Sequence, residues 1–321
     1  MQETEEQSSL RDRARKKLER ELGADLTGVL HDPRTIEIML NADGKLWQER
    51  LGESMRCIGT MHAAKARGIV KTVAGYHGRE LTRSNPTIEC EFPLDGSRFA
   101  GQIPPVVSEV VFAIRKKAVS VFTLQDYVVK GIMTAAQSAC IQDAVARRRD
   151  ILVIGGTGSG KTTLVNAVIE HIVTIDPDVR LVIIEDTGEI QCSAKNYIQY
   201  HTSAEVSMTQ LLRTTLRMRP DRIIVGEVRG PEALDLLMAW NTGHEGGVAT
   251  LHANDARAGL SRLAMLISMH PDSPKPIEPL IGDAVHLIVH IARTPEGRRV
   301  EEIIEVKGYE NGRYLTQTFR E

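Results

Sequence analysis

A glycine-rich segment that ends in lysine and threonine constrains this chain more than any other feature. Residues 155–163 read GGTGSGKTT, fit the pattern G-x-x-x-x-G-K-[ST] and directly follow the apolar run ILVI at 151–154. In such a loop the backbone N–H groups wrap a phosphate at a helix N-terminus, the lysine reaches the β- and γ-phosphates, and the next hydroxyl binds Mg²⁺. The segment therefore predicts a nucleotide site, formed by Gly156, Thr157, Gly158, Ser159, Gly160, Lys161, Thr162 and Thr163.

The region after residue 150 alternates apolar runs with helical patterns, which predicts a mostly parallel sheet covered by helices on both faces. We expect the last segment, 298–319, to add antiparallel strands at one edge. The runs that we interpret as buried strands are 151–154, 179–185, 222–227, 247–252 and 284–293. The segments that we interpret as helices are 161–173, 205–218 and 230–241.

The N-terminal region has a different pattern. Residues 10–22 repeat leucine or alanine every four positions and predict an amphipathic helix that ends near Gly23. Its other face is basic, so a solvated face and a contact with an anionic membrane surface both stay open. Short apolar runs separated by turn signals between about 35 and 115 predict a small α+β domain.

A length of 321 residues favours two domains. We expect an N-terminal α+β domain with its helix at 1–115, a linker at 116–133 and an α/β domain at 134–321. Thr134 and Gln137 predict a capping box that opens a helix extending to Ala146.

Composition excludes some classes of protein. The net charge is −2 and aromatic residues make up 4%, which disfavours a protein that binds single strands by base stacking. The four cysteines form no C-x-x-C pair, which leaves a zinc ribbon or a thiol redox motif unsupported. No apolar stretch approaches the roughly 18 residues that span a bilayer, so we expect a cytosolic or peripheral protein.

Acidic residues follow two of the expected strands. Glu185, Asp186 and Glu189 come at and after the end of one strand, and Glu227 ends another. In a parallel sheet these ends converge on the phosphate-binding edge. One carboxylate could polarise an attacking water while another anchors the magnesium shell, although acidic residues at strand ends also occur simply in turns.

Gly226 precedes Glu227 at the position where most enzymes with this phosphate-binding loop have an aspartate. With this feature, the chain resembles the secretion (traffic) ATPases of the type IV secretion and conjugation branch. The resemblance rests on GGTGSGKTT (155–163), IIEDTGEI (183–190), LLRTTLRMRPDRIIVGEVRG (211–230), TGHEGGVATLHAND (242–255), DGSRFAGQIPPVV (95–107) and FAIRKK (112–117).

The resemblance implies a RecA-like P-loop domain preceded by a PAS-like α+β domain, and it implies roles for individual residues. Lys161 and Thr162 would hold phosphate and Mg²⁺, Glu185 would be the base or water-positioning residue, Glu227 would act in the magnesium and water shell, and His252 would contact or sense the γ-phosphate. Arg98 and Arg115 would reach the nucleotide at the cleft between the two domains. One or more of Arg213, Arg217 and Arg219 would report the nucleotide state across a subunit boundary.

Each role has an ordinary structural alternative. His252 would be a buried histidine hydrogen-bonded within the sheet. His244 would only be part of a loop whose shape is set by the neighbouring glycines. Arg98 and Arg115 would be surface ion-pair residues. Arg217 and Arg219 would simply end a helix before Pro220.

The function implied by the resemblance is Mg²⁺-dependent hydrolysis of ATP by a homohexamer at the cytoplasmic face of the inner membrane. Its partners would be components of a type IV secretion, or mating-pair-formation, channel, and no sequence-specific nucleic-acid binding is expected. A type IV pilus or type II secretion motor and a ring DNA helicase or translocase are the alternatives. A scaffold that holds ATP with negligible turnover is a further alternative, and the intact Glu185 and Glu227 argue against it.

Overall fold

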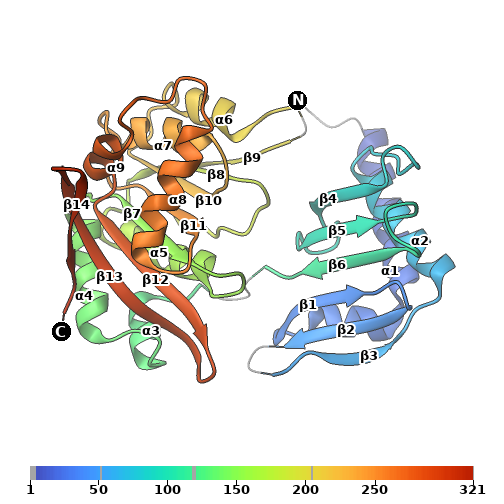
Figure 1. Ribbon diagram of the computed structural model, residues 1–321. Coiled ribbons are helices and arrows are strands. Elements are labelled where there is room, and N and C mark those ends of the chain that lie inside the picture. The colour runs from blue at the N-terminus through green and yellow to red at the C-terminus, as the bar shows by residue number, and fades with distance from the viewer. Residues whose placement is uncertain (1–4, 51–52, 118–120, 204, 321) are drawn as a thin grey trace. The chain divides into compact units, whose positions relative to one another are not determined.

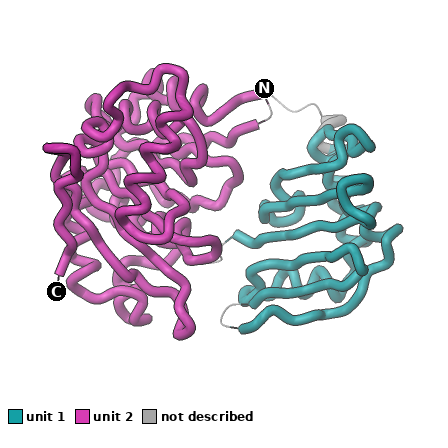
Figure 2. The backbone as a smooth tube through the Cα atoms, viewed as in Figure 1, with its two compact units in different colours: residues 1–119 teal, residues 120–321 magenta. Residues whose placement is uncertain are grey.

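The structure, a computed structural model, describes residues 5–50, 53–117, 121–203 and 205–320. The chain divides into two compact units, residues 1–119 and residues 120–321, which Figure 2 colours separately. The first is called unit 1 and the second unit 2. Among the described residues, no helix is both long and apolar enough to cross a membrane.

Unit 1 is an antiparallel sheet with two helices on one face (Figure 1). The strands follow the order β3-β2-β1-β6-β5-β4. They are β1 (Thr35–Leu40), β2 (Lys45–Arg50), β3 (Arg56–Thr60), β4 (Thr87–Glu91), β5 (Arg98–Gln102) and β6 (Val111–Arg115), and the helices are α1 (Glu5–His31) and α2 (Ala63–Tyr76).

Alternation along the strands of unit 1 produces its core. Ile38, Phe99 and Ile114 are fully buried beneath the helices, whereas their neighbours along the strands point to the opposite face. Helix α1 contributes a buried leucine every fourth residue from Leu18. The backbone of Gly23 leaves helical geometry (φ 76°), so the expected helix end is present, and a second helical segment then continues to His31.

Unit 2 is built on an eight-stranded sheet in the order β14-β13-β12-β7-β11-β10-β8-β9. From β12 to β9 all neighbouring strands are parallel, and β13 and β14 add an antiparallel edge. This confirms the predicted α/β sheet with its antiparallel end. The strands are β7 (Ile151–Gly155), β8 (Arg180–Glu185), β9 (Asn196–His201), β10 (Arg222–Val228), β11 (Val248–His252), β12 (Leu287–Thr294), β13 (Gly297–Glu310) and β14 (Arg313–Thr318).

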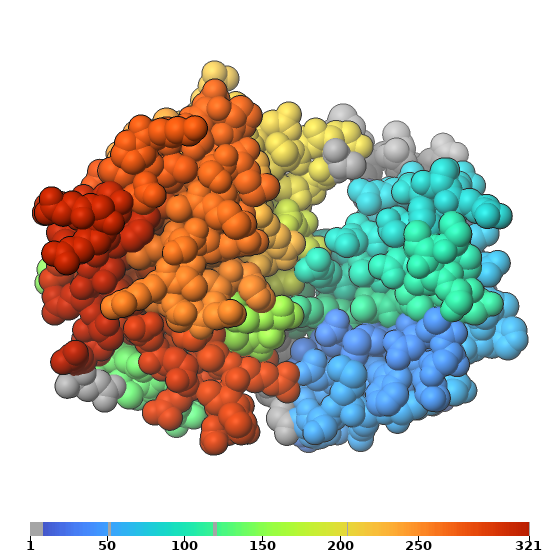
Figure 3. All heavy atoms as spheres, viewed as in Figure 1, coloured from blue at the N-terminus to red at the C-terminus, as the bar shows by residue number. Residues whose placement is uncertain are grey.

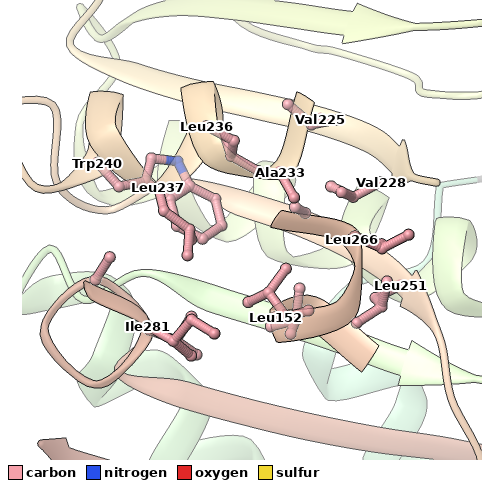
Figure 4. Packing of buried hydrophobic residues seen from close by; sticks show 14 of the residues in the cluster. Leu152, Val225, Val228, Ala233, Leu236, Leu237, Trp240, Leu251, Leu266 and Ile281 are labelled. Carbon is pink, nitrogen blue, oxygen red and sulfur yellow. The ribbon is translucent and has the colours of Figure 1, made fainter. Parts of the chain in front are cut away.

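Helices cover both faces of this sheet. Because side chains alternate along a strand, Leu152 and Ile154 of β7 pack on one face and Ile151 and Val153 on the other. The fully buried Trp240 is part of the core on the first face (Figure 4). It is covered by α6 (Met208–Thr215), α7 (Glu232–Trp240), α8 (Ala256–Ser268) and α9 (Glu278–Ala284), and the second by α3 (Leu124–Val129), α4 (Ala135–Ala146) and α5 (Lys161–Ile175).

Local sequence signals account for some elements and not for others. The capping box at Thr134 is present, and α4 ends at Ala146 as predicted. Strands β5 and β9 and helices α2, α8 and α9 were not among the elements named from the sequence, and α6 is shorter than the segment 205–218. Helix α3 lies within the segment expected to be a linker, where Thr123 and Asp126 form a second capping box. In the view of Figure 3, the C-terminal part of unit 2 (orange to red) forms much of the surface of that unit.

Candidate functional site

The glycine-rich loop joins β7 to α5 at the carboxyl edge of the sheet. Gly158 and Gly160 have positive φ angles of 71° and 97°, which side chains with a Cβ rarely adopt. A Cβ on Gly155 would lie 2.1 Å from the carbonyl oxygen of Ile291 on β12. The loop therefore needs glycine for its backbone angles and for its close contact with the next strand.

Lys161 and Thr162 begin α5 and face the loop and the neighbouring acidic segment. The Lys161 Nζ donates to the carbonyl oxygens of Gly155 and Gly156, at 3.0 Å each. The Thr162 hydroxyl donates to Glu189 Oε2 at 3.3 Å. The structure therefore brings together the end of the loop and the acidic segment after β8.

Glu185 ends β8 and is 2% exposed. Its Oε2 accepts hydrogen bonds from the backbone N–H groups of Glu189 and Ile190 at 2.8 and 3.0 Å, and its Oε1 accepts one from the Gln199 amide. His201 Nε2 lies 3.5 Å from the same Oε1. Since both oxygens are occupied, Glu185 holds the backbone of the segment that carries Glu189.

Glu227 lies on β10 immediately after Gly226, and its side chain is 26% exposed. A Cβ on Gly226 would lie 2.7 Å from the Cβ of Glu185, so the buried glutamate on the neighbouring strand requires glycine here. Glu227 pairs with Arg229, which also contacts Asp186 at 3.2 Å. Burial lowers the pKa of Arg229, but the hydrogen bond to Glu227 and the charge of Glu227 outweigh burial and raise the pKa above its usual value.

The two candidate histidines lie at opposite ends of β11. His252 ends the strand opposite Gly155 and is exposed, so the alternative of a buried histidine within the sheet does not hold. His244 precedes β11 at the amino edge of the sheet, beside Gly246, whose carbonyl accepts from Arg222. Only His252 therefore lies at the same edge as the loop.

Arg98 and Arg115 belong to unit 1. They are directly opposite each other on β5 and β6, on the face of the sheet away from the buried Phe99 and Ile114. Both are half-buried, and Arg98 lies 3.7 Å from Glu89. The two arginines are adjacent to each other, and their role at a nucleotide stays a prediction.

The three arginines before β10 have different surroundings. Arg213 forms a hydrogen bond to Asp235 at 2.9 Å and lies 3.5 Å from His270, within its own unit. This hydrogen bond and the charge of Asp235 raise the pKa of Arg213. Arg217 and Arg219 are exposed, and Arg219 has a positive φ of 54°.

Oxygen ligands suitable for Mg²⁺ meet at this edge. Magnesium in nucleotide sites takes one or two protein oxygens and completes its shell with phosphates and waters. The Thr162 hydroxyl, which contacts the Glu189 carboxylate, is one such oxygen, and Glu227 lies near the end of β10 at the same edge. Within the described ranges, no group of three or more His, Cys, Asp or Glu side chains is placed to hold a metal ion.

The sequence of the chain matches proteins of secretion and conjugation systems. The profile of the family "Type II/IV secretion system protein" matches residues 83–313. The "Probable conjugal transfer protein TrbB" of Sinorhizobium fredii is 50% identical over 299 residues, covering 93% of this chain and 91% of that protein. The "Conjugal transfer protein TrbB" of Rhizobium radiobacter is 48% identical over 304 residues, covering 95% and 94%.

The fold also matches a solved structure. The structure titled "Crystal Structure of the Pilus Retraction Motor PilT and Bound ADP" aligns with a TM-score of 0.63, covering 85% of this chain and 79% of that one. The two sequences are 20% identical, so this match concerns the fold. It agrees with a RecA-like α/β domain that follows an N-terminal domain.

Proposed function

The chain belongs to the Type II/IV secretion system protein family, and from this premise we propose that it is a Mg²⁺-dependent ATPase that powers type IV secretion or conjugation. The relatives that share about half of its residues are conjugal transfer proteins, which favours conjugation over pilus retraction or type II secretion. The observation that carries the proposal is the contact between Thr162 of the phosphate loop and Glu189 of the acidic segment.

We assign the phosphates to the N–H groups of residues 156–160 and to Lys161. The lysine would exchange its two carbonyl partners for β- and γ-phosphate oxygens, which carry full negative charge. Thr162 and Glu227 would hold the magnesium ion and its water shell. When bound, the ion would neutralise charge that develops on the transferred phosphoryl group.

The acidic segment would position the attacking water. The resemblance assigns this role to Glu185, whereas the geometry supports a division between two carboxylates. Glu185 is buried and holds the N–H groups of Glu189 and Ile190, and Glu189 directs its carboxylate to Thr162. We therefore propose that Glu189 acts on the water and that Glu185 holds Glu189 in position.

Residues from elsewhere would complete the site. His252 would contact the γ-phosphate from the end of β11, and Arg98 and Arg115 would reach the nucleotide when the two domains close. Arg217 or Arg219 would act across a subunit boundary, since Arg213 is already bonded to Asp235 in its own unit. An arginine that reaches the transition-state charge can raise the rate by roughly 10³- to 10⁵-fold, so hydrolysis would depend on closure.

We propose that the active form is a homohexamer at the cytoplasmic face of the inner membrane, with components of a mating-pair-formation channel as partners. A nucleotide held between mobile parts shifts their populations only if it binds the closed and open arrangements with different affinity. Closure of the site would in this way be converted into domain motion.

Substitution of the lysine tests the proposal. Lys161→Ala removes the charge that meets the phosphates, and we expect ATP hydrolysis and conjugation to be abolished while the circular dichroism spectrum stays unchanged. Lys195→Ala changes an exposed lysine of the same unit and is the matched control. Normal DNA transfer from cells that carry only the Lys161 variant would contradict the proposal, and hydrolysis that depends on added DNA would favour a translocase.

A further inference from the structure

An arginine near the C-terminus contacts the phosphate loop. The Arg298 Nε donates a hydrogen bond to the carbonyl oxygen of Gly158 at 3.2 Å, although the two residues are 140 positions apart. A Cβ placed on Gly160 would lie 3.0 Å from Arg298 Cδ, so the stem of the arginine runs along the same loop. Arg298 is half-buried and therefore is not an ordinary solvated side chain.

The strand that carries Arg298 is fixed by its neighbours. The turn between β12 and β13 is closed by Thr294, whose hydroxyl donates to the Gly297 carbonyl at 3.1 Å. Val300 donates its N–H to the Ile132 carbonyl at 2.8 Å and accepts from the Gln137 amide at 3.2 Å. The beginning of β13 is thus held by the α3–α4 segment, and the arginine extends from a fixed position.

The positive charge of Arg298 also acts on a neighbouring helix. Burial raises the pKa of the Tyr127 phenol on α3, and the charge of Arg298 opposes that shift. This agrees with the hydrogen bonds that join the start of β13 to the α3–α4 segment.

The hydrogen bond fixes the orientation of a donor that the loop needs. The Gly158 carbonyl and the Ser159 N–H belong to one planar trans peptide unit, so they point in opposite directions. Arg298 holds the carbonyl from one side of the loop. The Ser159 N–H therefore points away from Arg298, and its nitrogen lies 3.4 Å from the Gly156 carbonyl oxygen, to which it donates. On nucleotide binding this N–H would exchange the carbonyl for a phosphate oxygen.

We propose that Arg298 is a positioning residue of the nucleotide site, which fixes the 158–159 peptide so that its N–H faces the phosphates. The inference rests on the proposed nucleotide site and adds to it a residue outside the sequence blocks that predicted the site. Hydrogen bonds that involve a charged group contribute more than neutral ones, so loss of this bond weakens phosphate binding measurably.

The test measures binding of Mg²⁺–ADP to the full chain by calorimetry, together with the KM and kcat of ATP hydrolysis. We expect Arg298→Ala to raise the Kd and KM about tenfold with a smaller change in kcat. Arg298→Lys keeps the stem and the charge but lacks the Nε donor, and it is expected to weaken binding at least about threefold. Arg299→Ala removes the exposed neighbouring arginine and should stay within about twofold of the wild type.

The remaining outcomes overturn the inference. Wild-type affinity in Arg298→Ala or in Arg298→Lys would overturn it. Equal weakening by Arg299→Ala would also overturn it, because it would indicate a general charge effect. If Arg298→Ala melts at a clearly lower temperature than the wild type, the affinity of Arg298→Lys is used to judge the inference. A wild-type protein that binds no nucleotide would overturn the proposed function together with this inference, whereas tight wild-type binding with unchanged variants overturns the inference alone.

Discussion

The two edges of the unit 2 sheet use the same local chemistry for different purposes. At the carboxyl edge, buried Glu185 accepts from the consecutive N–H groups of Glu189 and Ile190. At the amino edge, fully buried Asp150 accepts from the consecutive N–H groups of Gly246 and Gly247, at 2.9 and 2.8 Å. In each case a buried carboxylate fixes the backbone of a loop, which begins four residues after Glu185 but 96 residues after Asp150.

The difference lies in what each loop carries. The loop held by Glu185 bears a glutamate that contacts Thr162, so fixing it shapes a site. The loop held by Asp150 leads directly into β11, and the Asp150 carbonyl also accepts from the N–H groups of His286 and Leu287 at the start of β12. Asp150 thus fastens the starts of two strands on either side of β7. A buried carboxylate with two backbone donors is therefore no indicator of catalysis by itself.

The largest effect that we expect in this comparison is at the carboxyl edge. Glu189→Gln keeps the shape and a hydrogen-bond acceptor for Thr162 but removes the charge, and kcat should fall about 100-fold, which is about 3 kcal/mol in the barrier. Steady-state phosphate release measures it. Glu301→Gln, at an exposed glutamate of the same unit, should leave the rate unchanged.

Glu185→Gln sharpens the distinction between the two glutamates. If Glu185 only positions the segment, this variant retains more activity than Glu189→Gln and shows the larger fall in melting temperature. A rate lower than that of Glu189→Gln, without loss of stability, would instead assign the water to Glu185.

The next effect concerns stability at the amino edge. Asp150→Ala leaves the N–H groups of Gly246 and Gly247 buried without their acceptor, which should lower the free energy of unfolding by about 2 kcal/mol. Urea denaturation can follow Trp240 in a Trp47→Phe background, because these are the two tryptophans of the chain. Mg²⁺–ADP affinity should stay near that of the background protein while the variant is folded; a large loss would show that the two edges are coupled.

The smallest effect is a pH dependence from the same residue. Burial raises the pKa of Asp150, and the neighbouring His286 together with the N–H groups of Gly247 and Gly246 opposes the shift without cancelling it. The native state therefore holds this proton more tightly than the unfolded state. Its contribution to stability is present at low pH and is lost as pH rises from the ordinary aspartate value through the raised one. Unfolding titrations of wild type minus Asp150→Asn should show this slope, and the opposite slope would contradict it.

The elements that carry a local signal were predictable from the sequence. The phosphate loop, the buried strands and the capping box at Thr134 are each encoded within a few neighbouring residues. The edge strand β9 was not predicted because its exposed and half-exposed residues form no apolar run. Helix α2 was not predicted because its small and basic residues interrupt the apolar pattern.

The site was predictable as a list of residues but not as an arrangement. Glu185 and Glu189 are both acidic residues of one segment, and only the fold shows that one is buried and the other contacts Thr162. Gly226 departs from the usual pattern, and the structural reason is the Cβ of Glu185 on the neighbouring strand. Arg298 lies in a sequence region without a motif, so no local signal could have indicated its contact with Gly158.

Strand β13 runs from the carboxyl edge to the amino edge of the unit 2 sheet. At about 3.3 Å per residue, its 14 residues extend over about 45 Å. It begins next to Arg298 at the phosphate loop, and its residues Glu305 to Lys307 line a cavity of about 840 Å³ beside Arg149 and His286 at the amino edge. One strand thus contributes side chains to the surroundings of the phosphate loop at one end and to the opposite edge of the sheet at the other.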